Sequence, residues 1–261
     1  MAKSVLLLRL EGPLQAWGSR ARWDVRDTQP EPTKSGIIGL LGCAMGLPKG
    51  DPRLETELDT GLRFGVRVEN PGRVLVDYHT ITDYLPTAGR EWKAAANQRS
   101  KSLERLQSDP DSRPATVVSP RAYLQDAAFL VTLEETGNHG TLLERCATAI
   151  QHPQWPLYLG RKACIPTRPI FERLADEYES IEDALRRHPW SWLGARAAVR
   201  TPAVMPRSLT AWVEVVAAGQ PGLVVRQDAI RTNLARQYGF RNAQCLDVPL
   251  ASVYTAKETG P

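Results

Sequence analysis

The sequence predicts an α+β fold in which strands and helices follow the order β-α-β-β-α-β. Three observations indicate this fold class. A short apolar run opens the chain, a glycine-studded apolar stretch with helical spacing follows it, and later runs alternate apolar and polar residues before a second amphipathic helix. That order of elements is the signature of a ferredoxin-like fold.

The first strand and helix are predicted from residues 4–47. Residues 4–10 (SVLLLRL) form an apolar run typical of a buried strand. Residues 35–47 (SGIIGLLGCAMGL) carry apolar side chains at helical spacing, and glycine recurs at Gly36, Gly39 and Gly42. We therefore expect a β-loop-α opening, with another element packed closely against the glycine side of the helix.

Later segments complete the order. Residues 62–70 and 73–82 alternate apolar and polar side chains on either side of a Pro-Gly turn, which predicts a hairpin. Residues 121–135 are expected to form a further strand pair or one long strand, and residues 140–151 an amphipathic helix. Residues 156–160 (PLYLG) are predicted to be the last strand.

Two regions fall outside this order. Residues 83–120 are too long for a tight turn and too polar for a core, so we expect a functional or disordered insertion. Residues 161–261 begin in a glycine-basic turn, become rich in Arg, Pro and Trp, and are expected to end in a small β-rich lobe. We therefore predict a first domain over residues 1–160 that contains the insertion, and a second region over residues 161–261.

Composition excludes several classes of protein. The 261-residue chain has four cysteines with no CxxC or His-paired spacing, so we expect a reduced, cytoplasmic protein without a structural zinc site or disulfide framework. The first apolar run is interrupted by Arg9 and is too short for a signal peptide or membrane span. A net charge of +4 suits a polyanionic partner but does not require one.

The predicted helix begins on Thr33-Lys34-Ser35. A P-loop needs glycines where this chain has Thr28 and Thr33, so a nucleotide-triphosphate loop is rejected. Free N–H groups, two hydroxyls, an ammonium and the helix dipole nevertheless suit a phosphate or a carboxylate. The alternative is an ordinary Thr or Ser cap with a solvated lysine.

Catalytic motifs are sparse. No acidic cluster has metal-ligand spacing, and no GxSxG or strand-linked GxGxxG occurs, so we expect no metal and no cofactor. Tyr78 and His79 at a strand end could run a metal-independent RNA cleavage by deprotonating a 2′-hydroxyl. A histidine at a hairpin edge that bonds to backbone is the alternative.

Basic and aromatic residues gather in predicted loops. Arginine and aromatic side chains hold single-stranded RNA by neutralising phosphates and stacking on bases. Core anchoring by the tryptophans, with solvated arginines around them, is the alternative. The candidates in the first loop, the insertion and the glycine-basic turn are Trp17, Arg20, Trp23, Arg26, Arg99, Gly160, Arg161 and Lys162.

Three ordered segments, LLLRLEGPLQAWG, RDTQPEPTKSGIIGLL and YLGRKACIP, resemble the CasD-type subunits of the type I-E CRISPR surveillance complex, Cascade, within the RAMP superfamily. The resemblance implies a ferredoxin-like palm related to the RNA-recognition motif, a thumb at residues 83–120 and a glycine-rich loop at Gly160-Arg161-Lys162. The aromatic pattern of that motif is absent from residues 63–70 (RFGVRVEN), so base stacking is expected from loops.

The resemblance also implies a role in antiviral DNA interference. CasD-type subunits grip the 5′ handle of the CRISPR RNA, cap the backbone of CasC subunits and lie next to the large subunit CasA, so target DNA is met only through the complex. Thr33, Lys34 and Ser35 would then receive handle phosphates or base edges. The alternative is an endoribonuclease that processes precursor CRISPR RNA with Tyr78, His79 and Lys34, since type I-C relatives cut their own precursor.

Overall fold

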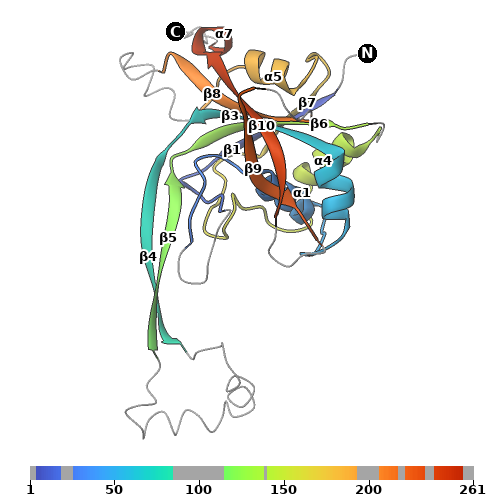
Figure 1. Cartoon of the computed structure of the whole chain (residues 1–261). Helices are drawn as coiled ribbons and strands as arrows, with labels where there is room; N and C mark the ends of the chain where they lie inside the picture. The colour runs from blue at the N-terminus through green and yellow to red at the C-terminus, as the bar shows by residue number, and fades with distance from the viewer. Residues whose placement is uncertain are drawn as a thin grey trace, which may run out of the picture. The chain divides into compact units, whose positions relative to one another are not determined.

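The computed structural model describes residues 4–18, 26–84, 115–137, 140–192, 206–216, 221–232 and 238–254 (Figure 1). The chain divides into two compact units. The first unit contains residues 1–19, 28–75 and 123–261, and the second contains residues 20–27 and 76–122. The structure is α+β, as the sequence predicts.

The first unit is built on a seven-stranded sheet in which every described strand pair is antiparallel. Its strand order is β7-β1-β6-β3-β8-β10-β9. The strands are β1 (Val5–Glu11), β3 (Leu62–Asn70), β6 (Ala128–Glu135), β7 (Phe171–Ala175), β8 (Ser208–Val215), β9 (Leu223–Ile230) and β10 (Tyr238–Pro249). The helices are α1 (Lys34–Ala44), the π-helical η1 (Leu54–Asp59), α4 (Leu142–Gln151), α5 (Ile181–Arg187) and α7 (Leu250–Val253).

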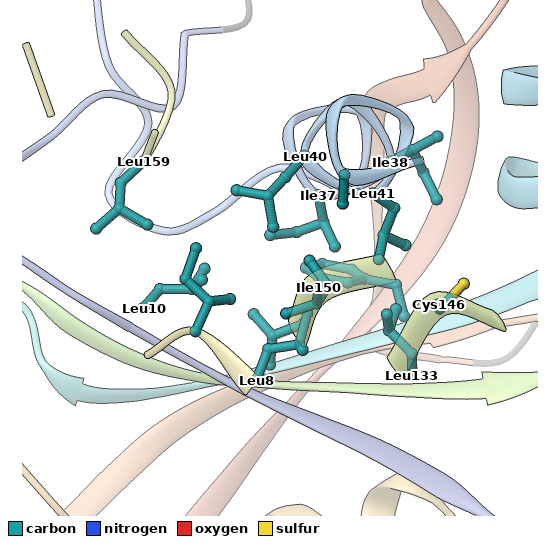
Figure 2. Close-up of a cluster of buried hydrophobic side chains, with 14 of the residues drawn as sticks. Leu8, Leu10, Ile37, Ile38, Leu40, Leu41, Leu133, Cys146, Ile150 and Leu159 are labelled. Atoms are coloured by element: carbon teal, nitrogen blue, oxygen red, sulfur yellow. The ribbon is translucent and has the colours of Figure 1, made fainter. Parts of the chain in front are cut away.

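Both faces of the sheet are buried at β1, which is buried at all seven of its positions. Leu6, Leu8 and Leu10 belong to the cluster that α1 and α4 cover. Figure 2 shows this cluster, in which Ile37 and Leu41 of α1 meet Leu8 and Leu133 of the sheet. Val5 and Leu7 point to the other face, where a second cluster includes residues of α5 and α7. The predicted strand and both predicted helices are thus confirmed.

The glycine side of α1 is packed as expected at two of three positions. A Cβ at Gly36 would lie 2.9 Å from the Trp17 ring, and one at Gly42 would lie 2.4 Å from Leu54 Cδ2. Gly39 has no atom within 4 Å of such a Cβ. Trp17 and Leu54 are therefore the neighbours that these glycines admit.

The predicted hairpin of residues 62–70 and 73–82 is wrong. Strand β3 pairs with β6 on one side and β8 on the other, so neither of its edges is open to a third strand. Strand β4 (Arg73–Tyr84) instead lies next to β5 (Ala115–Gln125) in a separate sheet of order β2-β5-β4, where β2 is Leu14–Gln15. Residues 121–135 hold two strands, the end of β5 and the whole of β6, and not one long strand. The two strands do not pair with each other, because they belong to separate sheets.

The strand predicted at residues 156–160 is also wrong. The position next to β1 is taken by β7, and residues 152–170 form an irregular connection. Four prolines in this connection remove backbone donors that a ladder would need. They are Pro153, Pro156, Pro166 and Pro169.

The region of residues 161–261 is β-rich, and its four described strands, β7, β8, β9 and β10, belong to the same seven-stranded sheet. A domain boundary at residues 160/161 stays a prediction. The insertion predicted at 83–120 includes the last two residues of β4 and the first six of β5. The residues between these strands, 85–114, lie outside the described part of the chain. Its role as a thumb stays a prediction as well.

His188, the residue that follows α5, forms a polar cluster with Tyr178 and Glu172. The Nδ1 atom of His188 is 3.0 Å from the Tyr178 hydroxyl, and Nε2 is 3.5 Å from a carboxylate oxygen of Glu172. Burial lowers the pKa of His188. The hydrogen bond from His188, aided by Arg9 and Arg168, lowers the pKa of Glu172 to about 2.

We expect this cluster to make the fold sensitive to acid. An unfolded histidine with a pKa near 6.5 takes up a proton that native His188 resists, so stability is complete above about pH 6.5 and declines below it. Glu172 adds a second loss between its unfolded pKa of 4.5 and about 2. Thermal midpoints measured from pH 8 to pH 2 should show this profile. His188→Gln should flatten it between pH 7 and 5, and an unchanged slope would contradict the assignment.

Candidate nucleic-acid interface

The start of α1 already holds an anion, and that anion belongs to the chain itself. Thr33 is the N-cap, and its hydroxyl accepts a hydrogen bond from the Gly36 N–H at 3.2 Å. The Lys34 N–H donates to Oδ2 of Asp228 on β9 at 2.8 Å. Asp228 and the Thr33 hydroxyl therefore engage two of the N–H groups that suggested a phosphate site, and the Asp228 carboxylate lies at the positive end of the helix dipole.

The Lys34 side chain is also engaged inside the fold. Its Nζ atom is 2.9 Å from Glu214 of β8, and the residue is only 3% exposed. Ser35 is half-buried, with its hydroxyl 3.4 Å from that of Thr33. The prediction that Thr33, Lys34 and Ser35 present groups to an external anion is corrected here, because this helix start joins α1 to β8 and β9.

Trp17 is a core residue. It is 2% exposed, its Nε1–H donates to the Gln15 amide oxygen at 3.0 Å, and its ring lies against Gly36. Its ring therefore has no exposed face on which a base could stack. Of the other candidates, Arg20, Trp23 and Arg99 lie outside the described residues.

Arg26 is exposed and lies in the second unit. Its N–H donates to the Pro120 carbonyl at 3.0 Å, and its carbonyl accepts from the Ala122 N–H at 2.8 Å. These backbone bonds hold the end of the first loop against β5. Contact between the Arg26 side chain and RNA stays a prediction.

The glycine-basic turn is tightly folded and fixed to the chain after β1. The Leu159 N–H donates to the Cys164 carbonyl at 2.8 Å, and the Ala16 N–H donates to the Leu159 carbonyl at 3.0 Å. Gly160 has a φ of +98°, and a Cβ there would lie 1.9 Å from the Ala16 carbonyl oxygen. Only glycine permits both this backbone conformation and this approach.

Two cations follow Gly160 in the turn. The guanidinium carbon of Arg161 lies 4.7 Å from the centroid of the Tyr123 ring, which orients this half-buried side chain by a cation–π contact. Lys162 is exposed. The arrangement presents two positive charges from a backbone that is fixed in place, which is suited to a phosphate chain.

Sequence reasoning missed Tyr123 and Trp155. Tyr123 is 6% exposed and lies at the end of β5, so nothing in the local sequence relates it to Arg161. Trp155 is 45% exposed in the same connection as the turn. The sequence feature that could have indicated an exposed Trp155 is its position between Pro153 and Pro156, a few residues before Arg161 and Lys162.

Comparison with known proteins assigns the family. A family model described as CRISPR-associated protein (Cas_Cas5) matches residues 5–242. The chain belongs to this Cas5 family. It is 32% identical over 177 residues to the CRISPR system Cascade subunit CasD of Escherichia coli (strain K12), covering 65% of the chain and 70% of that protein. The resemblance noted from the sequence is thereby confirmed.

Two solved structures share the fold of this Cas5-family chain over almost its whole length. A chain of a CRISPR RNA-guided surveillance complex is 28% identical, with a TM-score of 0.64, covering 98% of this chain and 95% of that one. The crystal structure of a Cas protein is 29% identical, with a TM-score of 0.62, covering 97% and 98%.

Among the candidate catalytic residues of this Cas5-family chain, Lys34 is buried, and its ammonium is paired with Glu214. Tyr78 and His79 are adjacent on β4, so their side chains point to opposite faces of the strand. Tyr78 is 70% exposed, and the His79 Nδ1 atom lies 3.7 Å from Asp77. A catalytic role for these residues stays a prediction.

Within the described ranges, no group of three His, Cys, Asp or Glu side chains could hold a metal ion. A search of the same residues for a helix long and apolar enough to cross a membrane found none.

Proposed function

We propose that this Cas5-family chain is the subunit of a Cascade-type complex that grips the 5′ handle of the CRISPR RNA during DNA interference. The family model, the 32% identity to a Cascade subunit and the fold match to a CRISPR RNA-guided surveillance complex support this role. The observation that carries the RNA assignment is the fixed turn at Gly160, which presents Arg161 and Lys162.

The core of the first unit is a ferredoxin-like palm in this proposal. The strand order β7-β1-β6-β3, with α1 and α4 packed in the same cluster on one face, supports it. On the opposite face, where an RNA-recognition motif stacks bases, the second apolar cluster contains residues of α5. RNA contacts are therefore assigned to loops.

Arg161 and Lys162 neutralise handle phosphates, and Arg20, Trp23, Arg26 and Arg99 are further contacts from the first loop and the thumb. The remaining candidates have a structural role in the first unit. They are Trp17, Thr33, Lys34 and Ser35. In the complex, the chain caps the row of CasC subunits next to CasA, and it meets target DNA only through the assembly.

RNA binding without cleavage is the expected activity. Incubation of the purified protein with repeat RNA in EDTA separates the two functions, because a metal-independent nuclease would still cut. Protection of the handle without cleavage supports the binding role. Cleavage at one site, lost in Tyr78→Phe or His79→Gln, would establish the nuclease instead.

The salt dependence of RNA binding tests the turn. Each phosphate contact on a single strand releases about 0.7 counterion. Replacing both Arg161 and Lys162 by alanine should therefore reduce the log-log salt slope by roughly 1 to 1.5 and weaken handle and scrambled RNA alike. Fluorescence anisotropy over a salt series measures both quantities. A double variant that keeps its slope but loses preference for the handle would show that the turn reads bases.

Tyr123 should matter through its ring alone. Tyr123→Leu removes the cation–π contact and should weaken RNA binding by about two- to fivefold, corresponding to about 0.5–1 kcal/mol. Tyr123→Phe keeps the ring and should bind as the wild type does. Equal affinities for the Leu and Phe variants, with folding intact, would show that Arg161 needs no such support.

A further inference from the structure

One face of the β9–β10 hairpin exposes two large apolar side chains. Val225 is 62% exposed and Phe240 is 68% exposed. Val225 lies opposite Asn242 in the ladder, and Phe240 lies two residues before Asn242 along β10, so the three side chains share a face. Large apolar side chains gathered on one surface are typical of an interaction site.

This face carries no charge. We call it the outer patch, and its residues alternate along the two strands. They are Leu223, Val225, Gln227, Phe240, Asn242 and Gln244.

The charged side chains of the hairpin are paired on its inner face. Arg226 lies 2.6 Å from Glu31, and Arg241 lies 2.7 Å from Asp228, whose other oxygen accepts from the N–H of Lys34. A surface without exposed cations is unsuited to RNA, whose affinity depends on neutralised phosphates. It matches an uncharged protein segment.

Other parts of the same sheet face are covered. Leu209, Ala211 and Val213 of β8 lie in the cluster that includes residues of α5 and α7. Strand β9 has its main contacts with β10, α1 and η1, and α1 meets the inner face through Asp228 (Figure 1). The outer patch is the part of this face that the described helices leave uncovered.

The edge of β9 is open beside the patch. Strand β9 is last in the strand order, and no described strand pairs with its outer edge. Beyond this stretch, η1 carboxylates satisfy the backbone: the Ile230 N–H donates to Asp59 at 3.2 Å and the Thr232 N–H donates to Glu55 at 2.8 Å. Residues 223–227 (LVVRQ) contain no proline, and their one charged side chain, Arg226, is paired with Glu31 on the inner face.

We propose that an extended, uncharged segment of another protein subunit adds as a strand along residues 223–227 of β9 and packs its side chains on the outer patch. Main-chain hydrogen bonds give such additions their affinity, and alternate side chains give specificity. A patch of six side chains buries on the order of a few hundred Å², below the roughly 1,000 Å² that a stable dimer needs. A neighbour that is also held elsewhere in an assembly therefore fits better than a second copy.

The inference rests on the proposed function for the identity of that neighbour, which is another subunit of the same complex. The probe is the set of partner subunits co-expressed with CRISPR RNA, and the readouts are native mass spectrometry and hydrogen exchange. Val225→Lys places a charge on the patch and should lower the yield of the intact assembly by roughly tenfold. Val225→Thr keeps an uncharged β-branched residue and should assemble normally, as should Thr148→Lys, which adds the same charge on exposed α4.

Hydrogen exchange gives a readout that requires no variant. The amides of residues 223–227 that point away from β10 should exchange slowly in the wild-type assembly and faster in the isolated chain. Equal exchange, or normal assembly of Val225→Lys, would overturn the proposal. A dimer of the isolated chain that Val225→Lys abolishes, or protection by RNA alone, would overturn it in favour of a second copy or RNA. Unchanged RNA affinity in the Arg161/Lys162 double variant would refute the RNA role while leaving this result intact.

Discussion

Replacing Glu69 by glutamine should lower the free energy of unfolding by about 3–5 kcal/mol. The Glu69 and Arg67 side chains are 0% exposed, and the Arg9 side chain is 2% exposed. One carboxylate neutralises both guanidiniums, at 2.6 Å from Arg67 and 3.0 Å from Arg9. Glutamine keeps the volume but leaves Arg67 without its carboxylate and leaves Arg9 with only Glu172, 3.5 Å from its Nε atom.

Urea denaturation followed by tryptophan fluorescence measures this loss, and Trp190 is a suitable reporter because its Nε1–H donates to the Glu69 carbonyl. Glu177→Gln is the matched control. Its partner Arg173 is 2.9 Å away, but the two side chains are 43% and 50% exposed, so the cost should stay below about 1 kcal/mol. Equal costs for the two variants would mean that the carbonyls of Leu185, His188 and Pro189 suffice for the arginines.

The two arginines also explain why the sequence could not predict this part of the fold. Arg9 interrupts the first apolar run and Arg67 lies within β3, and nothing in the sequence around either arginine indicates that it is buried. The carbonyls that receive them come from the chain after α5, more than a hundred residues further on. The sequence shows where each arginine lies, but only the tertiary fold determines which carbonyl groups it meets.

Hydrophobic periodicity predicted the strands and helices that contribute to the first apolar cluster. Strand β1, helix α1, strand β6 and helix α4 follow from spacing alone, because each buries its own apolar residues. Pairing was harder to predict, since β3 and β4 have similar patterns and a Pro-Gly turn between them. Their separation depends on β8, a strand that lies far along the sequence and occupies the second edge of β3.

The helix start illustrates the same limit at the level of the site. Thr33-Lys34-Ser35 has the composition of an anion site, and the structure places an anion there. The sequence could not show that the anion is Asp228, 194 positions later. The turn at Gly160 was easier to predict, because a glycine followed by two cations is a local pattern.

Replacing Gly160 by alanine should weaken handle binding by about one to two decades, since charge-assisted contacts contribute roughly 1.5–3 kcal/mol each. The new Cβ would lie 1.9 Å from the Ala16 carbonyl oxygen, where contacts under 3.0 Å essentially never occur. The turn must therefore move away from Ala16 by about 1 Å. That movement breaks the bond between the Ala16 N–H and the Leu159 carbonyl and displaces Arg161 and Lys162 together.

Gly50→Ala is the control that distinguishes the steric clash with Ala16 from the strain of a left-handed backbone conformation. Gly50 has a φ of +88°, close to the +98° of Gly160, but a Cβ there would meet no atom within 4 Å. Both variants should lose about 1–2 kcal/mol of stability from the left-handed conformation. Only Gly160→Ala should lose RNA affinity and reduce the salt slope, because only there does the side chain push a cationic turn off its support. If Gly160→Ala bound the handle as tightly as Gly50→Ala does, the turn could not be what positions the phosphates.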